Sequence, residues 1–319
     1  IKAQDLKSVA DNIMHDIRHR ETSRAKEKIE VIKNIGSLEC EVKTVLECLL
    51  IKTNLIDNSL PSESSRQEIL YFLRGRSNSD YITSVVMSIL IDLESRTQPS
   101  LAHERYNSIT EKSSHVIEVY LERLATESDI KEYFNSSNRI DLLEDELCGL
   151  VRGALRVHSF KLALEICTHL HDVFPSSNSQ ILFLICESSS LLSQGNSKHI
   201  WTLDGSVKIR VDRLIAQVSN MIDSQDARLA IVLINLLKIT LFSHTDLIIM
   251  GQKHADKIST LDSDISDKIN RALLSKLFEN SELDFSQISI DFERYLVLID
   301  ALKRKTIKGS IVEQWINKG

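Results

Sequence analysis

Two histidines near the start of the chain, His15 and His19, are spaced so that they could share a ligand. They stand four residues apart in the segment MHDIRHRE, and residues four apart lie on the same face of a helix. Two imidazoles at this spacing are a known arrangement for holding a metal ion. No third ligand is evident beside them, and the flanking residues are strongly charged. We therefore expect an exposed helix face here, without a metal ion or a cofactor.

The same segment resembles the phosphoacceptor box of histidine kinases, in which a histidine is followed by an acid and then by a basic residue. The resemblance implies that His15 is the phosphoacceptor and Asp16 its neighbouring acid. The segment departs from the family because Arg20 or Glu21 stands where a proline is expected, and no Gly-rich ATP-binding boxes follow. The alternative function is therefore a signalling protein whose N-terminal hairpin dimerises or carries a degenerate phosphoacceptor.

Residues 143–178 contain a second pattern, a helical hairpin with regularly placed aromatic, small and proline residues. Ala163 comes three residues after Phe160, and Pro175 comes twelve residues after Ala163. The alanine lets two helices approach, and the proline ring ends the second helix. The hairpin resembles a tetratricopeptide repeat, although Val151 stands where that family usually has a small residue, and the rest of the chain is not matched. The resemblance implies stacked hairpins with a curved surface that holds a peptide or another protein.

The resemblance also implies which residues of the first helix face the partner. They are Asp145, Cys148, Arg152, Leu155 and Arg156. The two arginines are four residues apart on one helical face, so their guanidiniums could grip a carboxylate of the partner. The structural alternative is that Arg152 and Arg156 are solvated or paired with Asp145 and Glu146.

The sequence lacks the other motifs that would indicate catalysis. There is no phosphate-binding Gly-rich loop, no G-x-S-x-G elbow and no dinucleotide fingerprint. Paired carboxylates occur at predicted helix starts, where the helix dipole favours negative charge. We therefore expect a non-catalytic protein–protein interaction, scaffold or sensor module, with no cofactor. An enzyme whose site is assembled from distant residues is the third class of function.

The elements that position these side chains are helices. The chain has 9 Gly and 3 Pro among 319 residues, too few turn residues for a sandwich, a barrel or a doubly wound sheet. Apolar periodicity predicts about fifteen helices. They include single long helices over residues 2–34 and 100–126, and a helix over 80–96 despite its β-branched residues. The predicted fold is all-α, with antiparallel hairpins stacked as an α-solenoid, and a compact multi-helix bundle is the alternative.

Two loops, one around Pro61 and one over residues 194–206, divide this predicted array. The resulting regions are an N-terminal helical hairpin (1–60), a helical repeat-like region (61–194) and a C-terminal helical region (195–319). Because both loops are short, we expect the three regions to form one continuous body.

Charge and cysteine content narrow the choice of partner and compartment. The net charge of −6 disfavours a general nucleic-acid binder, which needs a basic surplus. A short basic stretch over residues 303–308 could contact RNA, lipid or an acidic partner, and a solvated helix end is the alternative. The 5 cysteines are odd in number and form no Cys-x-x-Cys, which favours reduced core thiols in a cytoplasmic protein. No apolar run is long enough to span a membrane. The expected partner is another protein or a peptide, and a homodimer is the alternative.

Overall fold

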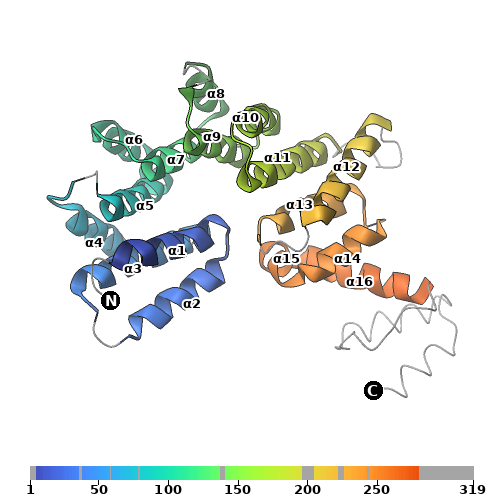
Figure 1. Ribbon diagram of the computed structural model, residues 1–319, viewed down its shortest axis with the longest axis horizontal. Helices are drawn as coiled ribbons and strands as arrows, with labels where there is room; N and C mark the ends of the chain where they lie inside the picture. Colours follow the sequence, from blue (N-terminus) through green and yellow to red (C-terminus); the bar gives the residue numbers. More distant parts are fainter. Residues whose placement is uncertain are drawn as a thin grey trace. The chain divides into compact units, whose positions relative to one another are not determined.

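The protein is all-α in its computed structural model (Figure 1). The described residues form 16 helices and no strand. They comprise residues 5–35, 38–57, 59–77, 80–136, 141–195, 205–221, 226–242 and 244–279. The predicted fold class is therefore confirmed at the level of secondary structure. The helices predicted at 286–305 and 309–317, the basic stretch 303–308 and most of the 194–206 loop lie outside these residues.

The chain divides into two compact units. Unit 1 comprises Ile1–Ser190 together with Asp226–Arg228, and unit 2 comprises Leu191–Gln225 and Leu229–Gly319. The three regions predicted from the loops stay a prediction.

Unit 1 contains ten complete helices and the larger part of an eleventh. They are α1 (Leu6–Arg18), α2 (Thr22–Lys33), α3 (Cys40–Ile56), α4 (Glu63–Leu73), α5 (Tyr81–Thr97), α6 (Pro99–Ser108), α7 (Ser114–Glu122), α8 (Glu127–Ser136), α9 (Glu144–Arg156), α10 (Phe160–Val173) and α11 (Ser177–Gly195).

Helix α5 is the central helix of unit 1. All residues from 82 to 94 are buried, and α3, α4, α6 and α7 pack against this helix. The residue before the helix, Asp80, is its N-cap, and its carboxylate accepts the backbone N–H of Thr83 at 2.9 Å. A helix buried on all sides is apolar all round, which explains why its sequence looks like a strand. The prediction of a helix over 80–96 is confirmed.

Alternate helices of unit 1 pack against one another in chain order. Helix α3 contacts α5, α5 contacts α7, and α7 contacts α9. The intervening helices lie against this row, with α4 and α6 on α5 and with α8 and α10 on α9 (Figure 1). Helix α1 contacts α2, α3 and α5, and it buries Leu6, Ala10, Ile13, Met14 and Ile17. This packing determines which side chains from distant parts of the sequence meet.

The single helix predicted over residues 2–34 is wrong, because the chain turns between α1 and α2. Arg20 has a φ of 59°, which places it in the left-handed region. The N–H of Glu21 donates to the carbonyl of Asp16 at 2.8 Å, and the N–H of Arg20 donates to the carbonyl of Ile17 at 3.0 Å. These two bonds form a Schellman motif, which usually has glycine at the left-handed position. Because an arginine occupies the left-handed position here, the residue types in this segment do not indicate that a helix ends.

The single helix predicted over residues 100–126 is also wrong. Helix α6 ends at Ser108, and Ser113 is the N-cap of α7, where its hydroxyl accepts the backbone N–H of Val116 at 3.4 Å. Serine at the position before a helix stabilises its first turn. Pro99 is the first residue of α6, where its missing N–H costs nothing, as predicted.

Unit 2 is built around a second apolar helix. The helices assigned to it are α12 (Gly205–Met221), α13 (Leu229–Ile239), α14 (Thr245–Lys253), α15 (Ala255–Leu261) and α16 (Ser263–Glu279). Helix α13 buries all its residues except two, and α12, α14 and α15 pack against it. Helix α16 packs on α14 and α15.

The described part of the chain tests two expectations drawn from composition, one on membrane-spanning helices and one on buried cysteines. No helix in it has the length and apolar character needed to cross a membrane. Its cysteines are free, but Cys40 is exposed, so the expectation that every cysteine is a core residue is wrong for this one. Burial raises the pKa of Cys48 and of Cys148 to about 12.

Candidate functional site

The two arginines predicted to grip a partner carboxylate are bound to α7 within unit 1. Arg152 forms ion pairs with Glu118 and, at 3.3 Å, with Glu122. Arg156 donates to the backbone carbonyl of Glu122 at 3.0 Å and to that of Leu124. The predicted alternative pairing with Asp145 and Glu146 does not occur among these contacts. The guanidiniums therefore join α9 to α7 and do not form a free carboxylate clamp.

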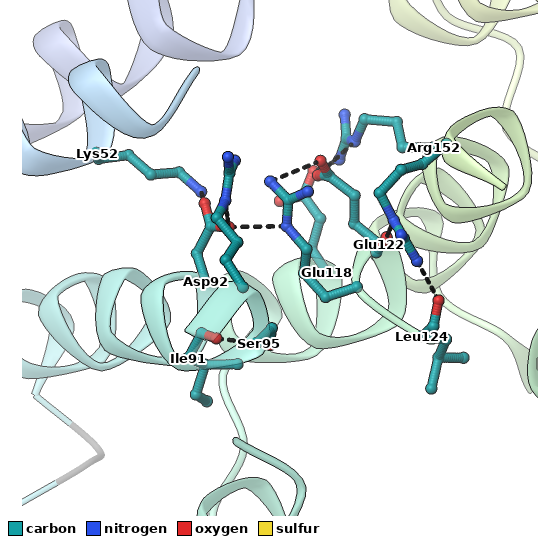
Figure 2. A network of polar contacts seen from close by, with 11 residues as sticks. Lys52, Ile91, Asp92, Ser95, Glu118, Glu122, Leu124 and Arg152 are labelled. Carbon is teal, nitrogen blue, oxygen red and sulfur yellow. Dashed lines mark hydrogen bonds and ion pairs between the residues drawn. The ribbon is translucent and has the colours of Figure 1, made fainter. Parts of the chain in front are cut away.

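These contacts belong to a polar network that crosses unit 1 (Figure 2). At its other end, the carboxylate of Asp92 on α5 lies 2.5 Å from Nζ of Lys52 on α3, 3.0 Å from Nε of Arg96 and 2.7 Å from Nε of Arg123. Burial alone would raise the pKa of Asp92, but the positive charges of Lys52, Arg123 and Arg96 outweigh it and hold the pKa far below its usual range. Asp92 is thus a charged, fully buried link between α3, α5 and the end of α7.

Glu118 connects α1 to α9, the first helix of the hairpin at residues 143–178. Its carboxylate binds Arg152 of α9 and, at 3.4 Å, Arg18 of α1. The two segments singled out by the sequence, around His15 and around Arg152, therefore meet at α7. Nothing in the local spacing of either segment predicts this, because Arg18 and Glu118 are 100 residues apart.

A second carboxylate, that of Asp226, lies near the end of α1. Arg228 binds both oxygens of Asp226, with Nη2 2.7 Å from one of them. His19 places Nε2 3.5 Å from Asp226 and Nδ1 2.8 Å from the carbonyl of His15. Hydrogen bonds and the charge of Arg228 lower the pKa of Asp226, although burial acts in the opposite direction. Asp226 therefore lies beside His19 at the end of α1.

Four arginines converge on this region, and we call Arg18, Arg20, Arg152 and Arg228 the arginine cluster. Arg18, Arg152 and Arg228 contact carboxylates, whereas the exposed guanidinium of Arg20 has no ion-pair or hydrogen-bond partner among the described residues. Burial, and then the charges of Arg18, Arg228 and Arg20, lower the pKa of Arg152. Three guanidiniums of the cluster are thus held by carboxylates, and the fourth, that of Arg20, is uncommitted, a group suited to binding a carboxylate.

The remaining predicted site residues lie around this cluster. His15 is exposed, and its ring centroid is 4.2 Å from that of His19. Its neighbour Asp16 is 1% exposed and lies 2.5 Å from Nζ of Lys28, so the acid is turned into the protein. Within the described ranges, no group of three or more His, Cys, Asp or Glu residues could hold a metal ion.

Asp145 and Leu155 complete the predicted partner-binding set. Asp145 is half-buried and lies close enough to His115 for its charge to raise the pKa of that histidine against the larger effect of burial. Leu155 is partly buried against the core that α7, α9 and α10 share. Leu155 therefore contributes to packing in unit 1.

His115 gives the arginine cluster a pH-dependent contact. Nη2 of Arg18 lies 2.7 Å from Nδ1 of His115. Because a guanidinium can only donate, Nδ1 is the acceptor and His115 is neutral. Burial, and then the charge of Arg18, lower the pKa of His115.

Acidification should therefore destabilise unit 1 through His115. Below about pH 6.5, the ordinary pKa of histidine, the unfolded chain binds a proton that the folded chain resists, so stability falls as the pH falls. We expect the melting temperature of unit 1 to fall between about pH 7.5 and pH 5.5, and His115→Gln to flatten that slope. An unchanged slope in the variant would show that other groups control the pH dependence.

The comparison with known proteins gives no match: no family model, no curated protein and no solved structure matches this chain. The likeness of residues 143–178 to a tetratricopeptide repeat therefore stays a prediction, and the function has to be argued from the site.

Proposed function

We propose that the chain is a non-catalytic interaction module whose helical hairpins stack as an α-solenoid, with a tetratricopeptide-like hairpin at residues 143–178. The chain-order packing of α3, α5, α7 and α9, with the intervening helices laid against them, supports this arrangement. Serial packing of this kind is typical of helical repeats. Free thiols fit a cytoplasmic location.

We propose further that the module binds an acidic segment of a partner protein at the arginine cluster. One observation carries this proposal: Arg20 presents an exposed guanidinium without a partner, beside the site where Arg18 and Arg152 already hold the carboxylate of Glu118. The other three guanidiniums of the cluster already contact Glu118, Glu122 and Asp226, so within the cluster Arg20 is the group that a further carboxylate would bind. Electrostatic complementarity of this kind sets the choice of partner and the rate of association.

The test uses Arg20→Glu and a fluorescent peptide rich in glutamate. We expect the wild-type chain to bind this peptide more tightly than a matched peptide with glutamine in place of glutamate. Because the substitution replaces an attractive charge by a repulsive one, Arg20→Glu should weaken binding about 10-fold, or about 1.4 kcal/mol. Fluorescence anisotropy at low and at physiological salt measures both effects, and salt should weaken them.

Arg74→Glu is the matched control, because Arg74 is also an exposed arginine of unit 1 whose guanidinium has no partner among the described residues. Its binding should equal that of the wild type. Charge reversal at Arg152 or Arg156 is a poor test, since it would break contacts with α7. The proposal fails if the glutamate and glutamine peptides bind equally, or if Arg20→Glu changes nothing.

A further inference from the structure

Unit 2 contains a hollow between α12 and α14, and no residue of the arginine cluster lines it. It has a volume of about 510 Å³, and we call it the α12–α14 groove. Its lining comes only from these two helices and the residue that precedes α14: Asp212, Ile215, Ala216, Ser219, His244, Asp246, Ile249, Met250 and Lys253.

The two walls of the groove have the same pattern. On α12 the lining residues stand at 212, 215, 216 and 219, and on α14 they stand at 246, 249, 250 and 253. Each set follows the i, i+3, i+4, i+7 spacing of a single helix face. Each wall also begins with an aspartate, continues with two apolar residues and ends with a polar or charged residue. Two such faces, side by side, form the kind of groove in which a third helix packs by placing its own ridge between them.

Apolar side chains in and beside the groove are left open to solvent. Ile249 is 46% exposed, and Ile209, one turn before Asp212 on α12, is 70% exposed. Ile215 and Met250, which also line the groove, are 8% and 6% exposed. The small side chain of Ala216 on the α12 wall leaves room for a close approach. A partner that covered this groove would therefore bury the exposed surface of Ile249 and, beside the groove, of Ile209, and burial of apolar surface favours association.

The polar groups of the groove are uncommitted. The carboxylates of Asp212 and Asp246 and the ammonium of Lys253 have no ion pair or hydrogen bond among the described residues. Nδ1 of His244 is buried and has no hydrogen-bond partner there either. Elsewhere in unit 2 a carboxylate is paired, since Asp262 lies 2.8 Å from Nζ of Lys238. A few convergent polar groups around an apolar hollow are typical of a binding site, and a buried unpartnered nitrogen calls for a ligand atom.

From these observations we infer that the α12–α14 groove binds one amphipathic helix of a partner protein. The helix carries an aliphatic stripe for Ile215, Ile249 and Met250, with arginine or lysine beside the stripe for Asp212 and Asp246. Charge complementarity points to this occupant, because both walls begin with a free carboxylate. The mode is a helix laid in a groove. The inference concerns unit 2 alone and stands whether or not the arginine cluster binds an acidic segment.

The test selects helices from a phage-displayed library built on an alanine-rich helical scaffold, with the full chain as bait. We expect the enriched helices to combine an aliphatic stripe with neighbouring basic residues. By fluorescence polarisation they should bind the wild type at least about 10-fold more tightly than Ile249→Asp. Leu261→Asp is the matched control, because Leu261 is 42% exposed on α15 and does not line the groove. It should bind like the wild type, and circular dichroism should show that both variants fold.

A charge swap tests the chemistry of the occupant. The double variant Asp212→Lys/Asp246→Lys should lose at least about 10-fold in affinity for a selected basic helix. It should gain affinity for the same helix with its basic residues replaced by glutamate. The inference is overturned if no helix is enriched, if the selected helices are acidic, or if they bind Ile249→Asp as well as the wild type.

Photocrosslinking identifies any other occupant. With benzoylphenylalanine at position 249 of the full chain alone, we expect no crosslinked product. A crosslink within one chain to residues 281–319 would assign the groove to the protein's own C-terminal segment. A crosslink between chains would assign it to a second copy. Either product would overturn the inference that a partner's helix occupies the groove.

Discussion

Replacing Asp92 by asparagine should lower the free energy of unfolding of unit 1 by about 3–5 kcal/mol, because it breaks a buried ion pair by removing one partner. Asp92 is fully buried, and it lies 2.5 Å from Lys52, which is itself 7% exposed. The amide has nearly the same shape but no charge. Lys52 would therefore remain in a buried site without a counter-charge, and Arg123 would keep only the carboxylate of Glu122, 3.7 Å from its Nη2. The measurement is hydrogen exchange of α3, α5 and α7 together with urea unfolding, so that unit 1 is followed separately from unit 2.

Glu132→Gln provides the control, because Glu132 is an exposed carboxylate of α8 whose side chain has no partner among the described residues. The change should alter stability by no more than about 0.5 kcal/mol. If Asp92→Asn were equally harmless, the Lys52–Asp92–Arg123 contacts would contribute nothing to the packing of α3 on α5 and α7. The contacts of Glu94 would then be expected to contribute little as well, because Glu94 is also fully buried and is held by Arg66 and Arg105.

The helices could be predicted from the sequence because their signals are local. Apolar periodicity and the scarcity of glycine and proline act within one or two turns, and they placed α5 correctly in spite of its β-branched residues. The errors came where a local cap overrode the pattern. Arg20 in the left-handed region separates α1 from α2, and Ser113 is the N-cap of α7. An arginine in the position that usually has glycine leaves no signal in the sequence.

The charged contacts could not be predicted, because they join distant residues. Lys52 and Asp92 are 40 residues apart, and Arg152 is 34 residues from Glu118. Spacing showed that Arg152 and Arg156 share a helical face, but it could not show that both guanidiniums already contact residues between 118 and 124. One signal was present and was not used: Asp92 and Glu94 interrupt an otherwise apolar buried helix. Buried acids require partners, so this interruption predicts arginines or lysines arriving from other helices.

A second unused signal is the pair Gly149 and Gly153, four residues apart inside α9. Glycine costs a helix interior about 1 kcal/mol relative to alanine, so two of them need a reason. The structure supplies one in the contact of α9 with α7. A Cβ on Gly149 would lie 2.6 Å from the backbone carbonyl oxygen of Glu118, and a Cβ on Gly153 would lie 2.7 Å from that of Leu121. The sequence drew attention to Ala163 as the residue that lets helices approach, whereas here two glycines meet the backbone of α7.

Gly149→Ala should therefore destabilise unit 1, although alanine favours the helix. The nearest atom belongs to the backbone of α7 and cannot rotate away, so the two helices must separate and the contacts of Arg152 with Glu118 must lengthen. Overpacking of this kind costs about 1–3 kcal/mol or more. We expect a net loss of about 2 kcal/mol for Gly149→Ala, and a larger loss when Gly153→Ala is added. Urea unfolding with hydrogen exchange of α7 and α9 measures both.

Gly251→Ala separates this effect from a general intolerance of alanine at buried helical glycines. Gly251 lies in α14, and its added Cβ would lie 2.9 Å from Cδ1 of Ile269. That atom is the end of a flexible side chain, so it can move by rotation, and the gain in helix propensity should offset most of the cost. The stability of unit 2 should then change by less than about 1 kcal/mol. If Gly149→Ala lowered stability as little as Gly251→Ala, the interface between α7 and α9 would have room for an added methyl group. The geometry that holds Arg18 and Arg152 on Glu118 could then not depend on their close approach.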